Sequence, residues 1–157
     1  MATPNDLTDR LAAFLDAHHV ISLATMSSHG PHAANLFYAR NGLTLLWISD
    51  RSSRHSIELE ANPNVAATIA ADYEEYRQIR GLQISGRAHR ITDTAECAQA
   101  RVLLESRYAF LKPSAEVSSN VRTIYEQAQI YRLSPARMIL IDNSRGFGHK
   151  DTLDLGS

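Results

Sequence analysis

The sequence is poor in cysteine and in long apolar runs. Cys97 is its one cysteine, which excludes an internal disulfide framework and is typical of a reducing compartment. No apolar run reaches the roughly 18 residues of a membrane span. Asp6, Asp9 and Asp16 interrupt the apolar positions near the N-terminus, so no signal peptide is indicated. We therefore expect a cytoplasmic protein that does not interact with a membrane.

The sequence also lacks an excess of charge of either sign. Its 16 lysines and arginines nearly balance its 17 aspartates and glutamates, and the formal net charge is −1. Without a basic field to attract phosphate backbones, binding to nucleic acid is not expected. The 157 residues, 44% of them hydrophobic, suffice for one core and are few for two, so we expect a single domain over residues 1–157.

Metal-ligand spacings and reactive-thiol signals are missing as well. Seven histidines are present, but no His-x-x-x-His or Cys-x-x-Cys spacing occurs, so no metal site is expected. Cys97 lies among small apolar residues of a predicted helix, with no basic cluster nearby to activate it. We interpret it as an inert thiol.

Hydrophobic periodicity predicts helices near both ends of the chain and between strands. Apolar residues recur at helical spacing through residues 5–18, which predicts an amphipathic helix there. Thr92 or Asp93 can cap another helix that runs to about Tyr108. A weaker pattern predicts a helix near residues 115–127.

Apolar runs separated by turn residues predict an antiparallel sheet. The expected strands cover residues 19–26, 32–40, 43–49, 65–71, 81–91, 129–134 and 137–142. Asn41-Gly42 is typical of a type I′ hairpin turn, Gly86 indicates a bend or bulge, and Ser134-Pro135 separates the last two strands. Strands in this order predict a mainly β fold, a small closed barrel with peripheral helices.

The stretch "ISDRSSRHSIELEANP" follows the third strand and begins a short helix at about Ser53, which Asn62-Pro63 ends. The first N–H groups of a helix have no intrahelical acceptor, so a phosphate there gains donors, together with Arg54 and His55. The alternative is that Ser52 caps the helix while the basic side chains lie in solvent. Local sequence leaves both interpretations open.

Three stretches of the sequence are distinctive: "SLATMSSHGPHAANLFYA", "LTLLWISDRSSRHSIELEANPNVAATI" and "IRGLQISGRAHRI". They resemble the FMN-binding split barrels of the pyridoxamine 5′-phosphate oxidase-like superfamily. Within that superfamily, "ANLFYA", "IRGLQISG" and "DNSRGFGHK" are most similar to the small YhbP-type (UPF0306) proteins. The resemblance covers roughly residues 19–150, with residues 1–18 as an N-terminal helix.

The resemblance implies a split-barrel homodimer with two FMN sites. The flavin phosphate is then expected at the turn before the short helix, at Ser53, Arg54 and His55. The ribityl chain is expected at the preceding strand end, at Ile48 and Ser49, and the ring against the paired strand, at Ala34 and Asn35. Gly81 and Gln83 are expected to contact the flavin from the interface side. His55 stands where the oxidases usually have lysine.

The C-terminal segment departs from the oxidases. Their substrate-binding Arg-Leu-His is replaced by "NSRGFGHKDTLDL", in which Arg145, His149 and Lys150 offer charge without that pattern. Pyridoxamine 5′-phosphate oxidation is therefore not expected. Phe147 lies between two glycines. One interpretation is that its ring covers the flavin pocket or packs in the dimer interface; the other is that the glycines only turn the chain after the last strand.

Two classes of function follow from the resemblance. In the first, the protein is a flavin-dependent oxidoreductase, with a nicotinamide or similar electron donor and a small-molecule substrate, and no side chain is assigned as catalytic. In the second, the dimer binds flavin, deazaflavin or haem for storage, sensing or delivery. Sequence alone does not choose between them.

Overall fold

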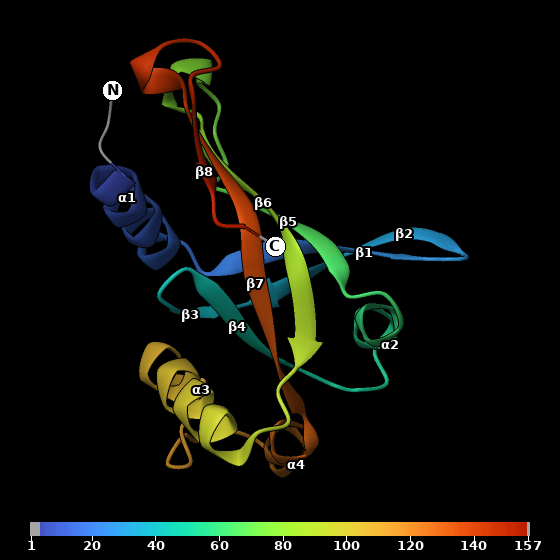
Figure 1. Cartoon of the computed structure of the whole chain (residues 1–157). Coiled ribbons are helices and arrows are strands. Elements are labelled where there is room, and N and C mark those ends of the chain that lie inside the picture. Colours follow the sequence, from blue (N-terminus) through green and yellow to red (C-terminus); the bar gives the residue numbers. More distant parts are fainter. Residues whose placement is uncertain (1–3, 157) are drawn as a thin grey trace.

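The computed structural model describes residues 4–156 and consists of a curled antiparallel sheet with helices around it (Figure 1). The sheet order is β2-β1-β5-β6-β7-β4-β3, and β8 pairs with β7. The strands are β1 (Val20–Ser27), β2 (Gly30–Phe37), β3 (Ala39–Asn41), β4 (Thr44–Ser49), β5 (Asn64–Ala70), β6 (Arg80–Arg90), β7 (Gln129–Asp142) and β8 (Lys150–Asp154). The helices are α1 (Pro4–Ala17), α2 (Arg54–Ala61), α3 (Thr94–Arg107) and α4 (Ser119–Gln127), with short 3₁₀ helices η1 (Tyr76–Gln78), η2 (Ala109–Leu111) and η3 (Asn143–Arg145).

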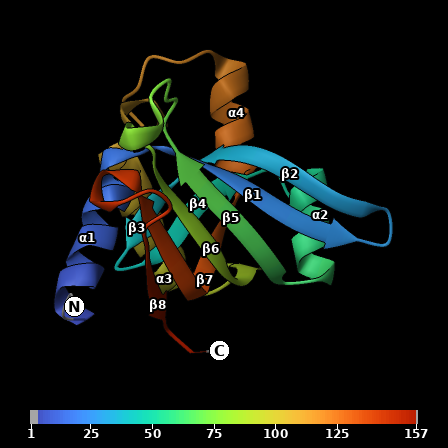
Figure 2. The same ribbon diagram turned by 90° about the horizontal axis from the view of Figure 1, so that it is seen from above.

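The helices lie on the sides and at one end of the barrel. Seen from above, α1 and α2 flank opposite sides of the sheet (Figure 2). Figure 1 shows α3 and α4 near one end of the barrel, and the turns that carry η1 and η3 at the other end. No helix within residues 4–156 is long and apolar enough to cross a membrane.

Large apolar side chains from α1 and most strands fill the barrel interior. They include Leu11, Leu15, Ile21, Leu23, Leu45, Trp47, Ile69, Leu82, Leu133 and Met138. A second cluster joins α3 to the outside of β3, β4 and β7 through Leu104, Ala100, Leu46 and Ile130. Burial of these apolar surfaces is the main source of stability.

The predicted single strand over residues 32–40 is wrong, because Tyr38 divides it. β2 pairs with β1, with Phe37 opposite Val20, whereas β3 pairs with β4, with Ala39 opposite Leu46. Tyr38 is buried, and its hydroxyl donates to the carbonyl of Leu15 at 2.7 Å. The chain thus passes from one edge strand of the sheet to the other at Tyr38, which is anchored to α1.

The predicted break at Ser134-Pro135 is also wrong, since β7 runs unbroken from Gln129 to Asp142. The register between β6 and β7 shifts between Ser85 and Gly86, and Gly86 lies opposite Pro135. A bulge accommodates the proline without ending the strand. The bulge predicted at Gly86 is thus confirmed.

The hairpin between β3 and β4 differs from the predicted type I′ turn. Asn41 pairs with Thr44, so the turn residues are Gly42 and Leu43. Gly42 has φ 59°, and no described residue other than glycine has a positive φ. A type I′ turn needs two successive positive φ values, which this hairpin does not have.

The remaining boundaries agree with the sequence except at the C-terminus. The expected helix over residues 5–18 appears as α1, and Asp93 rather than Thr92 caps α3. α4 begins at Ser119, later than expected, with Ser118 as its cap. Strand β8 was not predicted, because its five residues include a single large apolar side chain, Leu153.

Candidate functional site

The turn between β4 and α2 is built by Ser53. Its backbone is extended, its hydroxyl accepts from the N–H of Ser56 at 3.4 Å, and α2 begins at the next residue. Ser52 instead donates its N–H and its hydroxyl to Asp50, both at 2.7 Å. The helix cap is therefore Ser53, and the alternative that Ser52 caps the helix is wrong.

His55 lies inside this turn and not in solvent. Its exposed fraction is 8%. Its Nε2 lies 2.6 Å from the Ser49 hydroxyl and 3.1 Å from the Ser53 hydroxyl. Burial lowers the pKa of His55 below its ordinary value of 6.5. The imidazole is thus neutral at neutral pH and ties the strand end to the helix start.

Arg54 extends along the outside of α2. Its side chain is half exposed, and its Nε donates to Glu58 Oε1 at 2.7 Å. Thr25 on β1 donates its hydroxyl to Glu58 Oε2 at 2.6 Å. Hydrogen bonds from Thr25 and Arg54 lower the pKa of Glu58 to about 2. The carboxylate is charged throughout the physiological range and connects α2 to the sheet.

A cavity of about 350 Å³ opens beside this turn. Its walls come from β2, the end of β4, α3, η2 and α4, and they are predominantly apolar. The lining residues are Asn35, Leu36, Phe37, Ile48, Ser49, Asp50, Leu104, Phe110, Leu111, Val117, Val121, Arg122, Ile124, Tyr125 and Ala128. This volume lies in the range of small-molecule sites, roughly 300–1,000 Å³.

The structure brings together most of the predicted site residues. Asn35, Ile48 and Ser49 line the cavity, and Ala34 precedes Asn35 on β2. In the adjoining turn, Ser53 and His55 contact Ser49, and Arg54 is the first residue of α2. The Asn35 Oδ1 accepts from the Ser22 hydroxyl at 2.7 Å. This bond does not use the N–H donors of the Asn35 amide nitrogen.

Gly81 and Gln83 are not part of this cavity. Both lie on β6, which is separated from β2 by β1 and β5 in the sheet order. Gln83 pairs with Thr68 on β5 and with Ile139 on β7. Within one chain, the two predicted groups of flavin contacts therefore remain apart.

Sequence reasoning missed the outer wall of the cavity. Phe37 contacts Tyr108 and Phe110, with ring centroids 5.3 and 5.7 Å apart. α4 adds Val121, Ile124 and Tyr125, which lie at helical spacing on one face. That spacing was the available signal, but it covers little more than two turns and gives no indication of what the helix covers.

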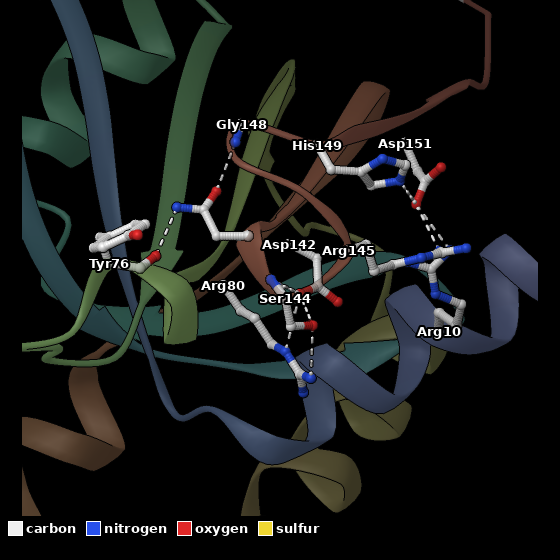
Figure 3. A network of polar contacts seen from close by, with 10 residues as sticks. Arg10, Tyr76, Arg80, Asp142, Ser144, Arg145, Gly148, His149 and Asp151 are labelled. Atoms are coloured by element: carbon white, nitrogen blue, oxygen red, sulfur yellow. Dashed lines mark hydrogen bonds and ion pairs between the residues drawn. The ribbon is translucent and has the colours of Figure 1, made fainter.

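The C-terminal segment forms a turn held by many polar contacts (Figure 3). Asn143 donates from Nδ2 to the carbonyl of Tyr76 at 2.7 Å and accepts from the N–H of Gly148 at 3.0 Å. Arg145 and His149 both contact Asp151, at 3.2 Å each. Phe147 is 85% exposed and lies against the Tyr76 ring.

Both glycines beside Phe147 have positive φ values, 133° for Gly146 and 71° for Gly148. They turn the chain between β7 and β8. Neither Arg145, His149 nor Phe147 lines the cavity described above. In a single chain, this segment is therefore a turn and not a cover of the cavity.

Metal-binding geometry is not found in the part of the chain that the structure describes. Within residues 4–156, no three histidine, cysteine, aspartate or glutamate side chains gather closely enough to hold a metal ion. The Cys97 thiol is partly buried and donates to the carbonyl of Ile91 at 3.4 Å.

Comparison with known proteins identifies the family of this chain. The sequence profile of pyridoxamine 5′-phosphate oxidase matches residues 7–140. The chain belongs to the pyridoxamine 5′-phosphate oxidase family. It is 30% identical to a UPF0306 protein of Yersinia pseudotuberculosis over 152 residues, 96% of this chain and 94% of that protein. The superfamily and the UPF0306 likeness expected from the sequence are thus confirmed.

Solved structures of other proteins share the fold at low sequence identity. A haem-binding protein from Mycobacterium smegmatis is 21% identical with a TM-score of 0.72, over 98% of this chain and 60% of that one. The chain thus spans less than two thirds of that protein. HutZ, the haem storage protein from Vibrio cholerae, is 17% identical with a TM-score of 0.64, over 81% and 88% of the two chains. The predicted split barrel with peripheral helices is confirmed.

Proposed function

We propose that this protein binds FMN in a homodimer and transfers electrons between a nicotinamide or similar donor and a small-molecule substrate. The observation that carries the proposal is the apolar cavity that begins at Asn35 and Ser49 and adjoins the first turn of α2. A flat ring system suits the cavity, and a phosphate group suits a helix N-terminus with an arginine beside it.

Each part of FMN meets residues of suitable chemistry. The N–H groups at the start of α2, apart from that of Ser56, which donates to Ser53, and the guanidinium of Arg54 would hold the phosphate. Ser49 and Ile48 would lie along the ribityl chain, and Asn35 would donate its amide N–H to a polar edge of the ring. When bound, FMN supplies the electron transfer, while the chain supplies position and a water-poor surrounding.

The cavity suits flavin better than haem, although two structural neighbours carry haem in their names. Haem iron needs an axial ligand such as histidine, cysteine, methionine or tyrosinate. Tyr125 is the one candidate among the lining residues. Its hydroxyl donates to Glu105 at 3.0 Å, and burial together with this bond raises its pKa, so it stays a neutral phenol.

We propose a homodimer because the two groups of predicted flavin contacts lie apart within one chain. We place Gly81 and Gln83 of one protomer at the flavin site of its partner, where β6 would cover the ring that one chain leaves open. A symmetric dimer in which both copies use the same surface provides two such sites. Light scattering at micromolar concentration is expected to give a dimer; an FMN-loaded monomer would contradict this part of the proposal.

The phosphate assignment is tested by titration calorimetry with FMN, riboflavin and haem. FMN is expected to bind most tightly, because riboflavin has no phosphate for the α2 turn. Arg54→Ala should cost about 1.5–3 kcal/mol of FMN binding as a lost charged hydrogen bond, and should leave riboflavin binding unchanged.

Arg51→Ala is the matched control. Arg51 belongs to the same turn but pairs with Glu60 at 3.4 Å. The Arg51→Ala substitution removes the same charge as Arg54→Ala and should change FMN affinity little. Equal affinity for FMN and riboflavin would overturn the phosphate assignment, and tightest binding of haem would favour the storage function suggested by the neighbours.

Turnover separates an oxidoreductase from a non-catalytic flavin carrier. FMN-loaded protein is mixed with excess NADH or NADPH and a small acceptor such as a quinone. Repeated oxidation of the donor is expected for the enzyme. A single stoichiometric reduction would show that the protein stores, senses or delivers flavin instead.

A further inference from the structure

Glu58 is a buried acidic side chain to which the proposed flavin contacts assign no role. Its exposed fraction is 6%. Thr25 donates to one carboxylate oxygen at 2.6 Å, and Arg54 donates to the other at 2.7 Å. The hydrogen-bonded series Thr25–Glu58–Arg54 thus runs from β1 to the exposed side chain of the first residue of α2.

The contact with Glu58 uses only part of Arg54. The hydrogen bond is made by Nε, one of the five N–H donors of a guanidinium. The four N–H donors on the two Nη atoms are not used in this pair, and the Arg54 side chain is 50% exposed. Arg54 can therefore keep its bond to Glu58 and bind a second anion at the same time.

Holding Nε in place reduces the number of rotamers that Arg54 samples. A free arginine side chain loses rotamer entropy when it binds a ligand, and a side chain already held by a neighbour loses less. Glu58 is itself held by Thr25, whose exposed fraction is 2%. The position of the guanidinium is thus set by the β1 strand through two successive hydrogen bonds.

We propose that Glu58 is a positioning residue for phosphate binding: supported by Thr25, it orients Arg54 so that the Nη groups face the phosphate of the flavin. The inference rests on the proposed function, and Glu58 itself does not touch the ligand. A competing role, in which Glu58 withdraws Arg54 from the phosphate, makes the opposite prediction, because removal of Glu58 would then strengthen binding.

The test compares FMN and riboflavin binding in four variants by titration calorimetry. Glu58→Leu should weaken FMN binding about tenfold and leave riboflavin binding unchanged, because only the phosphate uses Arg54. Glu58→Gln keeps an acceptor for Arg54 and should restore part of the affinity. Thr25→Val removes only the supporting hydroxyl and should weaken FMN binding about threefold.

Glu60→Leu is the matched control, since it removes the same charge from the same helix. Glu60 pairs with Arg90 at 3.0 Å and with Arg51 at 3.4 Å, whereas Arg54 pairs with Glu58. FMN affinity should stay near the wild-type value. A general effect of helix charge or helix stability would move both leucine variants together.

The outcomes distinguish the two proposals. No preference for FMN in the wild type would overturn the flavin-phosphate assignment and this inference with it. A wild-type preference that Glu58→Leu retains or increases would overturn the positioning role alone. If Glu58→Leu does not fold, Thr25→Val decides: unchanged discrimination between FMN and riboflavin contradicts the role of the Thr25–Glu58 pair.

Discussion

At the scale of single residues, His55 shows how burial changes the chemistry that a sequence position suggests. Its sequence neighbours, Arg54 and serines, favour an exposed phosphate-binding cation. In the structure, the ring is enclosed, with Ser49 and Ser53 as its partners, and its pKa is lowered. In the proposed flavin site, the helix N–H groups and Arg54 are therefore the phosphate donors that we propose, and His55 holds the turn in shape.

The lowered pKa of His55 predicts a pH dependence of stability. Between the folded-state pKa and the ordinary value of 6.5, the unfolded chain binds more protons than the folded one, so the free energy of unfolding falls as the pH falls. Carboxylates with lowered pKa values, such as Glu58, lose their contribution only at lower pH, below the ordinary 4.5.

Denaturant unfolding between pH 7.5 and 5 measures this effect. Wild type should lose stability over the range, while His55→Gln should show a flatter profile from a lower starting stability. His89→Gln, at an exposed position, is the control and should follow the wild type. Parallel profiles for wild type and His55→Gln would contradict the assignment.

At the scale of elements, the bulge between β6 and β7 depends on a close backbone approach. An ideal Cβ on Gly86 would lie 2.2 Å from the carbonyl oxygen of Ser134, closer than real contacts allow. At Gly81, on the same strand, the nearest atom would be the Ile69 carbonyl oxygen at 3.6 Å, an ordinary contact. Position 81 therefore has room for a methyl group, whereas position 86 does not.

Gly86→Ala is expected to destabilise the protein by about 1–3 kcal/mol, because backbone must move to admit the methyl group. Gly81→Ala should change the free energy of unfolding by about 0.5 kcal/mol or less. Chemical denaturation of both variants at pH 7.5 measures the difference. Equal effects would show that the β6–β7 approach is looser than the structure indicates.

α4 presents a different case, because none of its residues is buried although its apolar face lines the cavity. Ile124 is 62% exposed and lies in that wall, whereas Val102 on α3 is 65% exposed and does not line it. Such exposed positions contribute little to folding. The apolar face of α4 is thus exposed in the cavity, where a ligand can contact it.

Ile124→Asn should therefore change stability by about 0.5 kcal/mol or less and weaken FMN binding by about three- to tenfold as apolar contact with the ligand is lost. Val102→Asn, the matched control, should change neither quantity. Fluorescence titration with FMN and thermal unfolding measure the two effects. Loss of stability without loss of affinity would show that α4 is part of the core and not of the site.

At the scale of the whole molecule, membership of the family does not imply that the protein acts on the substrate of the oxidases. The barrel is that of the pyridoxamine 5′-phosphate oxidase family, but the C-terminal segment is a turn whose charged side chains contact one another. Arg145 and His149 share Asp151, and neither lines the cavity. In a single chain, no charged group of this segment is positioned to hold a phosphorylated pyridine there.

The protein is accordingly expected not to oxidise pyridoxamine 5′-phosphate at a useful rate. Misplacement of a substrate by about 1 Å costs on the order of a hundredfold in rate. Hydrogen peroxide and pyridoxal 5′-phosphate formation by FMN-loaded protein provide the measurement. Turnover of roughly 0.1 per second or faster, against about 10 per second for a typical enzyme, would contradict the prediction.

The sequence by itself determined the features that depend on neighbouring residues. Hydrophobic periodicity located α1, α3 and most strands, and a glycine inside the long predicted strand over residues 81–91 indicated the bulge, since both patterns reflect local backbone preferences. The motifs around Ser53 and Gly81 identified the family. Asn35, Ser49 and Arg54 were predicted as site residues, and the structure gathers them around one cavity and its adjoining turn.

Only the tertiary structure decided features that depend on contacts between distant segments. Tyr38, where the predicted strand divides, bonds to α1 through its hydroxyl; the buried His55 bonds to Ser49; and Glu58 accepts from a threonine 33 residues away. α4 becomes a cavity wall because β2 and β4 lie opposite it. These contacts arise when the sheet curls, and a short sequence window carries no information about which segments then meet.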